Sequence, residues 1–167
     1  MKKILLFIVL FFLVFCSFGC KEKTKVYPQY ITAENIYNGS SDKYLVYFEK
    51  ENCSQCAATY PSIVDYLTET SRKKDSLKIY SVLLEFVDDN GETVTLPISR
   101  SFDMQNTGQG PDGNFYVDGV TNWIALYIAA TPSLIEVSTV DGTKQSKLVA
   151  VGNSQIETYL TNLKTGK

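Results

Sequence analysis

The sequence predicts an α/β fold in which a central mixed sheet is flanked by helices. Short apolar segments that suit strands alternate along the chain with segments whose apolar residues recur at helical spacing. Two late apolar segments are joined around Asp141 and Gly142, a pair typical of a β-hairpin turn. The 167 residues, of which 44% are hydrophobic, suffice for one domain with its own core.

The first half of the chain supplies four expected elements. They are a short helix at residues 32–39, a strand at 43–48, a helix at 53–73 and a strand at 77–87. Within the long helix, Ile63, Tyr66 and Leu67 recur at helical spacing and predict its buried face. The strand at residues 77–87 is apolar enough for a sheet that is covered on both faces.

The second half supplies the remaining elements. They are a helix at residues 120–129, strands at 134–139 and 147–151, and a last helix at 154–163. Trp123, Leu126 and Tyr127 give the first of these helices its i, i+3, i+4 spacing. Ser154 and Glu157 form a capping-box pattern, which predicts where the last helix begins.

Residues 88–118 are left over from this order as an insertion rich in Gly, Asn and Asp. Two weak strand candidates lie within it, at residues 93–98 and 114–117. A structureless loop of this length is uncommon in a compact domain, unless it is functional or disordered. One interpretation is an extra hairpin that packs its own aromatic residues. The other is a substrate-facing loop near the functional site, with contact residues Phe102, Met104, Phe115 and Tyr116.

Cys53 and Cys56 form a C-x-x-C motif at the junction between the first strand and the long helix. The unpaired N–H groups and the dipole of the helix favour a thiolate at Cys53. Cys56 lies one turn later on the same helix face, close enough to form a disulfide with Cys53. Because such a pair carries two electrons as dithiol and disulfide, the motif predicts redox catalysis.

A zinc site and a purely structural disulfide are the alternatives to a redox pair. A structural zinc ion takes four ligands, usually Cys or His. The chain has no histidine, and its two other cysteines, Cys16 and Cys20, lie in the N-terminal apolar segment. A structural disulfide across so short a loop removes little unfolded-state entropy. We therefore expect no metal and no other cofactor.

Further residues at characteristic positions accompany the C-x-x-C motif. Pro61 lies five residues after Cys56, Thr131 and Pro132 precede a buried strand, and Gly152 ends the last strand. In combination with the two cysteines, this pattern resembles the thioredoxin superfamily over roughly residues 44–163. The resemblance implies a thioredoxin fold with an inserted loop or hairpin before the strand that follows a cis proline.

The resemblance also implies roles for residues of the site. Cys53 would be the exposed nucleophile and Cys56 the buried resolving thiol. The proline would be cis and lie beside the disulfide, and the backbone of the threonine before it would pair with an extended substrate. The substrate-binding residues implied in this way are Thr131, Pro132, Ser54 and Gln55.

Around the cysteines the chain departs from the family pattern. Asn52 replaces the usual aromatic residue before the first cysteine, and Ser54 and Gln55 replace the Gly-Pro or Pro-His pairs of relatives. The buried acid that assists the resolving cysteine would fall at Tyr47, which is not a ready proton acceptor at neutral pH. Three carboxylates are candidates to replace it, or are solvated charges near strand ends: Glu49, Glu51 and Glu85.

The N-terminus predicts export and attachment to a membrane. Two lysines precede the apolar residues 4–18, which are too few for a membrane-spanning helix and fit a signal peptide over residues 1–19. Gly19 and Cys20 resemble a bacterial lipobox, although Ser17 stands where leucine is usual. Cys20 would then carry lipid, residues 20–30 would form a tether, and residues 31–167 the domain. Plain secretion and an uncleaved anchor are the alternatives.

The expected function is that of a membrane-anchored, extracytoplasmic thiol–disulfide oxidoreductase. After cleavage and lipidation, Cys53 and Cys56 would be its only thiols, and their partners would be exported proteins and an unidentified redox partner. The alternative is a thioredoxin-like binding or accessory module for an exported peptide, with an incidental disulfide. The net charge of −2 predicts no nucleic-acid binding, and we expect a monomer.

Overall fold

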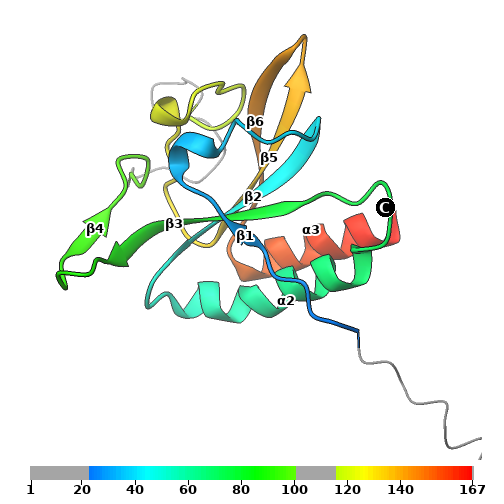
Figure 1. Ribbon diagram of the computed structural model, residues 1–167, viewed down its shortest axis with the longest axis horizontal. Helices are drawn as coiled ribbons and strands as arrows, with labels where there is room; N and C mark the ends of the chain where they lie inside the picture. The colour runs from blue at the N-terminus through cyan, green and yellow to red at the C-terminus, as the bar shows by residue number, and fades with distance from the viewer. Residues whose placement is uncertain (1–22, 101–115, 167) are drawn as a thin grey trace, which may run out of the picture.

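The computed structural model describes residues 23–100 and 116–166, which form a mixed sheet with helices on one of its faces (Figure 1). The six strands are β1 Gln29–Tyr30, β2 Lys43–Lys50, β3 Ile79–Val87, β4 Thr93–Thr95, β5 Ser133–Val140 and β6 Thr143–Val151. Their order is β1-β3-β2-β5-β6, with β4 paired to the far end of β3. β2 runs parallel to β3 and antiparallel to β5, so the sheet is mixed.

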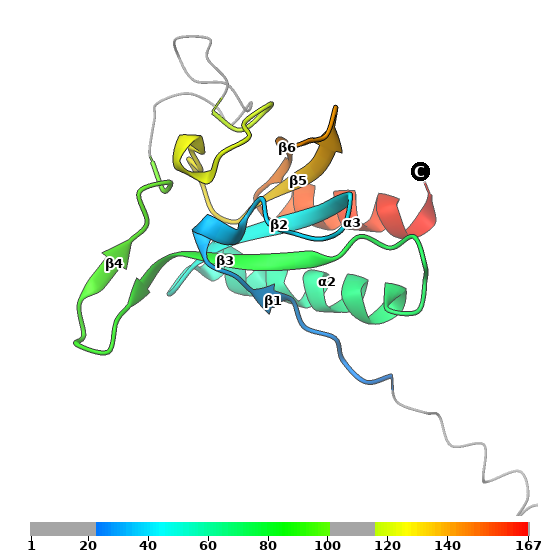
Figure 2. The same ribbon diagram turned by 45° about the horizontal axis from the view of Figure 1, so that its top comes forward.

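Two α-helices, α2 Ser54–Thr70 and α3 Asn153–Thr165, pack side by side against the same face of the sheet (Figures 1 and 2). The opposite face is covered by loops and by the short 3-10 turns η1 Ala33–Asn35 and η2 Trp123–Ala125. A covered sheet buries both faces of its central strands. β2 and β3 are near-continuously apolar because both of their faces are buried.

Strand β2 shows how the sequence builds two core layers. Side chains alternate between the faces of a strand. Leu45 and Tyr47 therefore pack toward α2 and α3, whereas Tyr44, Val46 and Phe48 pack toward the loops of the other face. All five are fully buried. This strand places the residues that follow it, among them the C-x-x-C motif, at the edge of the helical layer.

The expected strands are confirmed with small shifts at their ends, and both long helices form. The prediction of a helix at residues 120–129 is wrong. Asn122 caps the 3-10 turn η2 by accepting the N–H of Ile124 at 3.1 Å, and at Leu126 the backbone is already extended. Ile128 N–H then donates to the carbonyl of Ile98 at 2.8 Å. The apolar spacing therefore arises from an extended segment whose Leu126 and Ile128 side chains enter the core.

Two further helix predictions differ from the structure. The helix expected at residues 32–39 is a single 3-10 turn. Helix α3 begins at Asn153 after Gly152, whose φ of 75° turns the chain out of β6. Ser154 lies inside the helix and does not cap it. Gln155 provides the local contact instead, because its side-chain oxygen accepts the N–H of Val151 at 3.1 Å.

The first part of the insertion forms a hairpin, since β4 pairs antiparallel with the end of β3. Val117 is not in a strand, and residues 114–115 of that strand candidate lie outside the described residues. The proposed contact residues Phe102, Met104 and Phe115 lie outside them as well. Tyr116 is described, and its ring packs on that of Tyr127 with the centroids 4.3 Å apart.

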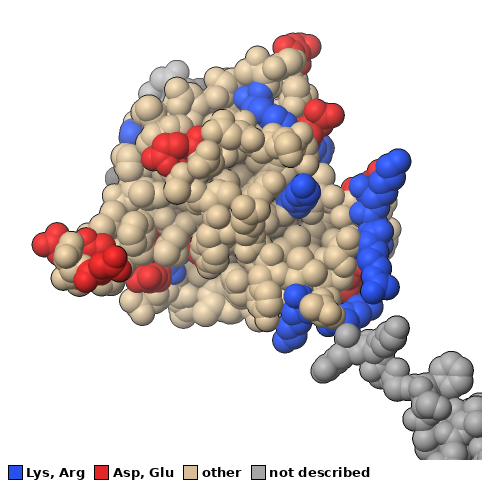
Figure 3. Space-filling model, viewed as in Figure 1, with Lys and Arg blue, Asp and Glu red and all other residues tan. Residues whose placement is uncertain are grey.

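On the face seen in Figure 3, a group of basic side chains and a group of acidic side chains lie at opposite ends of the molecule, and charges of both signs are mixed along its upper part. Basic side chains gather where α2 ends and the described chain begins: Lys23 and Arg72 line one hollow, and Lys73 donates to the carbonyl of Lys164 at 3.4 Å. Acidic side chains gather at the opposite end, over the turn between β3 and β4.

Candidate functional site

The two cysteines of the C-x-x-C motif are joined in a disulfide at the first turn of α2, with their sulfur atoms 2.06 Å apart. Cys53 is the N-cap of the helix, and its sulfur accepts the backbone N–H of Cys56 at 3.1 Å. This N–H is one of those that a helix leaves without an internal partner. The same donor and the helix dipole stabilise a negative charge on the Cys53 sulfur when the pair is reduced.

Asn52 makes the turn from β2 into α2 possible. Its φ of 57° lies in the left-handed region, which asparagine occupies more readily than most residues with a side chain. This conformation gives a physical reason for asparagine at the position before Cys53, where the resemblance led us to expect an aromatic residue.

The two sulfurs differ in their access to solvent. Cys56 is 2% exposed and faces the core, whereas Cys53 is half-buried at the surface. Tyr47 lies behind Cys56 and donates its hydroxyl to the Cys56 carbonyl at 3.2 Å. The exposed cysteine is therefore the one that a second protein can reach.

We expect iodoacetamide to alkylate Cys53 before Cys56 when the full-length protein is reduced without denaturation. Cys53 is both the more exposed sulfur and the one beside the unpaired helix N–H groups. Mass spectrometry of proteolytic fragments after increasing reaction times measures the two rates. Denatured protein is the control, since its two cysteines should react at similar rates. Faster alkylation of Cys56 in the folded protein would contradict the assignment of the nucleophile.

Thr131 and Pro132 are brought to the disulfide from the start of β5. The hydroxyl oxygen of Thr131 lies 4.0 Å from the Cys53 sulfur, and the Thr131–Pro132 bond is cis, as expected. Pro132 is held in place by its carbonyl, which accepts the N–H of Gly152 at 2.8 Å. A sulfur in a disulfide has no hydrogen to donate, so in this state the hydroxyl is the only donor available between Thr131 and Cys53.

Ser54 and Gln55 are exposed on the first turn of α2. Ser54 borders hollows on both sides of the motif, and Gln55 lines the one that also includes Gly152 and Asn153. Thr59 ties α2 to the first residue of α3 next to this second hollow, because its hydroxyl donates to the Asn153 side chain at 3.0 Å. Of the four predicted substrate-binding residues, Ser54 and Gln55 are thus exposed on α2, Thr131 lies beside the Cys53 sulfur, and Pro132 is buried.

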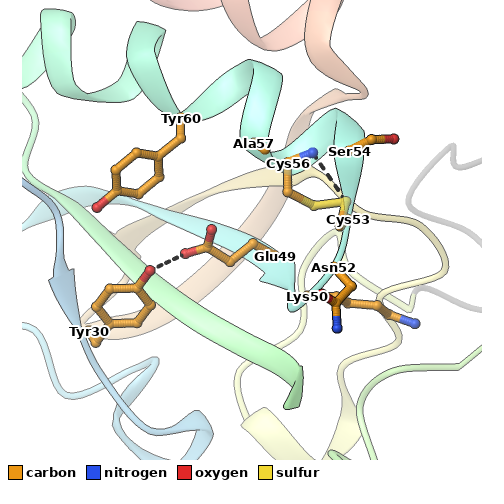
Figure 4. A pocket seen from close by; sticks show the side chains of 9 residues that line it. All are labelled: Tyr30, Glu49, Lys50, Asn52, Cys53, Ser54, Cys56, Ala57 and Tyr60. Carbon is orange, nitrogen blue, oxygen red and sulfur yellow. Dashed lines mark hydrogen bonds between the residues drawn. A yellow bond between two sulfur atoms is a disulfide. The ribbon is translucent and has the colours of Figure 1, made fainter. Parts of the chain in front are cut away.

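A hollow of about 620 Å³ lies directly beside the disulfide (Figure 4). Both cysteines contribute to its wall, and Ala57 and Tyr60 extend it along α2. Tyr30 enters from β1, across the sheet. The remaining residues that line it are Glu49, Lys50, Asn52 and Ser54.

Glu49 is the one carboxylate of the three candidates that lines this hollow. It is 8% exposed and accepts the hydroxyl of Tyr30 at 2.8 Å. Burial raises the pKa of its carboxyl above the ordinary value, and the hydrogen bond from Tyr30 opposes part of this rise. Glu51 instead accepts the N–H of Val87 at the surface, and Glu85 pairs with Lys50 at 3.5 Å.

Sequence reasoning missed two residues of the site, Tyr30 and Tyr60. Tyr60 follows Cys56 by four positions, so helical spacing alone places both on one face of α2 and was a usable signal. Tyr30 had no such signal. It belongs to a two-residue strand, and only the pairing of β1 with β3 brings it to Glu49.

Residues 23–100 and 116–166 hold no candidate for a metal site or a membrane span. In these ranges no three or more His, Cys, Asp or Glu side chains are grouped so as to hold a metal ion. No helix there has the length and apolar character needed to cross a membrane. Cys20 and the expected signal peptide lie outside the described residues.

Comparisons with known proteins do not place the chain in a family. No family model matches it, and no curated protein matches it. Over its described residues the structure establishes a mixed α/β fold, with a central six-stranded sheet and two α-helices, that carries a C-x-x-C disulfide at a helix N-terminus.

Proposed function

We propose that this protein has a thioredoxin-like fold and is a thiol–disulfide oxidoreductase of exported proteins. The observation that carries the proposal is the asymmetric disulfide. Cys53 is accessible and caps the helix, and Cys56 is buried behind it. The cis Thr131–Pro132 bond beside Cys53 agrees with the family resemblance of the sequence.

The reaction begins on the reduced protein. The Cys53 thiolate attacks one sulfur of a substrate disulfide, a mixed disulfide forms, and the other substrate sulfur leaves as a thiolate. The Cys56 thiolate then attacks the Cys53 sulfur. The Cys53–Cys56 disulfide forms and the second substrate thiolate leaves, so two electrons have passed to the substrate. The reverse sequence oxidises a substrate dithiol, and the redox partner decides which direction prevails.

Glu49 is suited to take part in proton transfer at the buried sulfur. The Cys56 thiol must lose its proton before it attacks Cys53, and Glu49 lines the same hollow as both sulfurs. Burial raises the pKa of Glu49, which makes it a better proton acceptor than an exposed carboxylate. In this proposal it replaces the acid that the family resemblance places at Tyr47.

The test of the proposed function is turnover. The purified full-length protein is mixed with a disulfide-containing peptide and reduced glutathione, and the release of peptide thiol is followed. In parallel, the protein is equilibrated in glutathione buffers of different composition, and the ratio of the reduced to the disulfide form of the Cys53–Cys56 pair is measured. The proposal requires both a reversible titration of the pair and peptide reduction faster than in glutathione alone. Titration without turnover would favour a binding module with an incidental disulfide.

The place of action is proposed from the N-terminal sequence. A diacylated cysteine carries two apolar chains, enough for stable membrane attachment where one chain is marginal. We expect labelled palmitate to enter the wild-type protein but not Cys20→Ser, and the variant to leave the membrane fraction or accumulate unprocessed. Cys16→Ser is the matched control and should be labelled like the wild type. Equal labelling of wild type and Cys20→Ser, or of neither, would contradict lipidation at Cys20.

A further inference from the structure

We propose that the hollow beside the disulfide binds a positively charged side chain, Lys or Arg, that lies near the reacting cysteine of the substrate. This inference rests on the proposed function, and adds to it the chemical class of substrate. It follows from three features of the hollow: a buried carboxylate with spare acceptor capacity, two tyrosine rings in the walls, and a lysine that is already paired elsewhere, the one basic residue among the described residues that line it.

The carboxylate is Glu49. It has two oxygens that together accept about four hydrogen bonds. It accepts the hydroxyl of Tyr30 at 2.8 Å, and the hydroxyl of Ser81 also stabilises its charged form, so acceptor capacity remains for an incoming cation. Its desolvation has already occurred on folding, because the side chain is 8% exposed. A cation that enters the hollow therefore meets a carboxylate that loses little further hydration, and only the cation itself must be desolvated. The low local dielectric strengthens the attraction between them.

The walls suit the rest of such a side chain. Figure 4 shows the rings of Tyr30 and Tyr60 on the same side of the hollow as the Glu49 carboxylate. Tyrosine faces attract ammonium and guanidinium groups, and their apolar surface accepts the methylene stem of Lys or Arg. Tyr30 is 55% exposed, so its ring would be covered by the entering side chain.

Lys50, the basic residue in the lining, does not pair with Glu49. Lys50 lines the hollow, but its ammonium group pairs with Glu85 at 3.5 Å. In Figure 4 it points away from Glu49. Of the two charged residues in the lining, Lys50 is thus compensated by a neighbour outside the hollow, and Glu49 has a neutral hydrogen-bond partner. The hollow therefore presents a negative charge to the substrate.

The test uses competition at equilibrium, which does not depend on catalytic rate. In the full-length Cys56→Ser variant, the Cys53 thiolate attacks the peptide sulfur of a peptide–glutathione mixed disulfide, and glutathione leaves as the thiolate. Equimolar peptides compete that carry Lys or norleucine at the same position, scanned over the three residues on each side of the cysteine. Mass spectrometry of the proteolytic fragment that contains Cys53 measures the ratio of bound peptides.

We expect the lysine peptide to be enriched on the order of tenfold at one or two positions, as for a close charge pair in an interface. Glu49→Gln should return the ratio to one. Glu51→Gln is the matched control, because that carboxylate lies two residues after Glu49, in the turn that follows β2, and is exposed at the surface; this variant should keep the preference. The preference should also persist in 0.5 M salt, which removes a diffuse attraction to the acidic end of the molecule but screens a buried pair far less.

Three outcomes would overturn the subsite. They are equal binding of the two peptides by the protein with Glu49, a preference for norleucine, and a preference for lysine that survives Glu49→Gln. In each of them Cys53 still forms mixed disulfides, so the proposed function stands. If no peptide forms a mixed disulfide at Cys53, the proposed function itself fails and the subsite fails with it.

Discussion

Cys53→Ser is expected to reduce turnover of a peptide disulfide to the rate of glutathione alone, a loss on the order of a thousandfold or more. A serine hydroxyl at this position is a far weaker nucleophile toward sulfur than a thiolate, and it cannot form the mixed disulfide. The fold should survive, because the side chain is half-buried at the helix N-terminus and serine is a good N-cap residue. Turnover is measured as peptide thiol released per protein, and circular dichroism checks the fold.

Cys56→Ser is the informative partner of this variant. Its Cys53 still attacks the substrate, but no second thiolate is present to release it, so the mixed disulfide should accumulate and be visible in a non-reducing gel. A binding module with an incidental disulfide would behave differently, because neither substitution would change its affinity for a peptide. Full turnover by Cys53→Ser would therefore contradict the oxidoreductase and leave the binding module as the better hypothesis.

Tyr47→Ala is expected to lower the free energy of unfolding by about 3–5 kcal/mol, as for other large aromatic residues removed from a core. Tyr47 has no exposed surface and packs in the layer between the sheet and the two helices, against residues such as Ile63 and Leu134. Its loss leaves a cavity directly under the first turn of α2, so we also expect the positions of Cys53 and Cys56 to change. Urea denaturation of the oxidised protein measures the effect.

Tyr47→Phe separates the packing of this residue from its hydroxyl group. The ring is kept, and the hydrogen bonds of the hydroxyl are lost, to the Cys56 carbonyl and with Thr59. The expected loss is about 1 kcal/mol. If Tyr47 were part of the proton transfer, turnover of the phenylalanine variant would fall much further than this small change in stability implies. We expect turnover close to that of the wild type, because Glu49 is the carboxylate that lines the hollow with the sulfurs.

The layers of the fold were predictable because they rest on local patterns. Strand β2 is a short, continuous apolar segment that suits a strand covered on both faces, and helix α2 carries apolar residues at helical spacing. Both formed where the sequence indicated. The segment at residues 120–129 failed for an equally physical reason. Its apolar residues fit a helical spacing, but the side chain of Asn122 ends the turn early, and Leu126 and Ile128 satisfy the core in an extended conformation.

The site was predictable only in part, because its residues come together from different distances along the chain. Cys53 and Cys56 are local to one helix turn, and the threonine and proline were found through the resemblance to a family. The choice of Glu49 among three carboxylates needed the side-chain alternation of β2, which puts it on the same face as Tyr47. Tyr30 depended on the pairing of a two-residue strand, which leaves no periodic trace in a sequence.

The length of α2 sets a spacing between two ends of the molecule. The first described residue, Lys23, lies beside Arg72 just past the last turn of this helix, and the disulfide lies at its first turn. The 17 residues between them make a rigid rod of about 25 Å, the full height of the helical layer. If the N-terminal segment is attached to a lipid surface, the length of α2 separates the disulfide from that surface. It would then work on chains that reach well beyond the headgroups, and polypeptide lying flat on the bilayer would be out of its range.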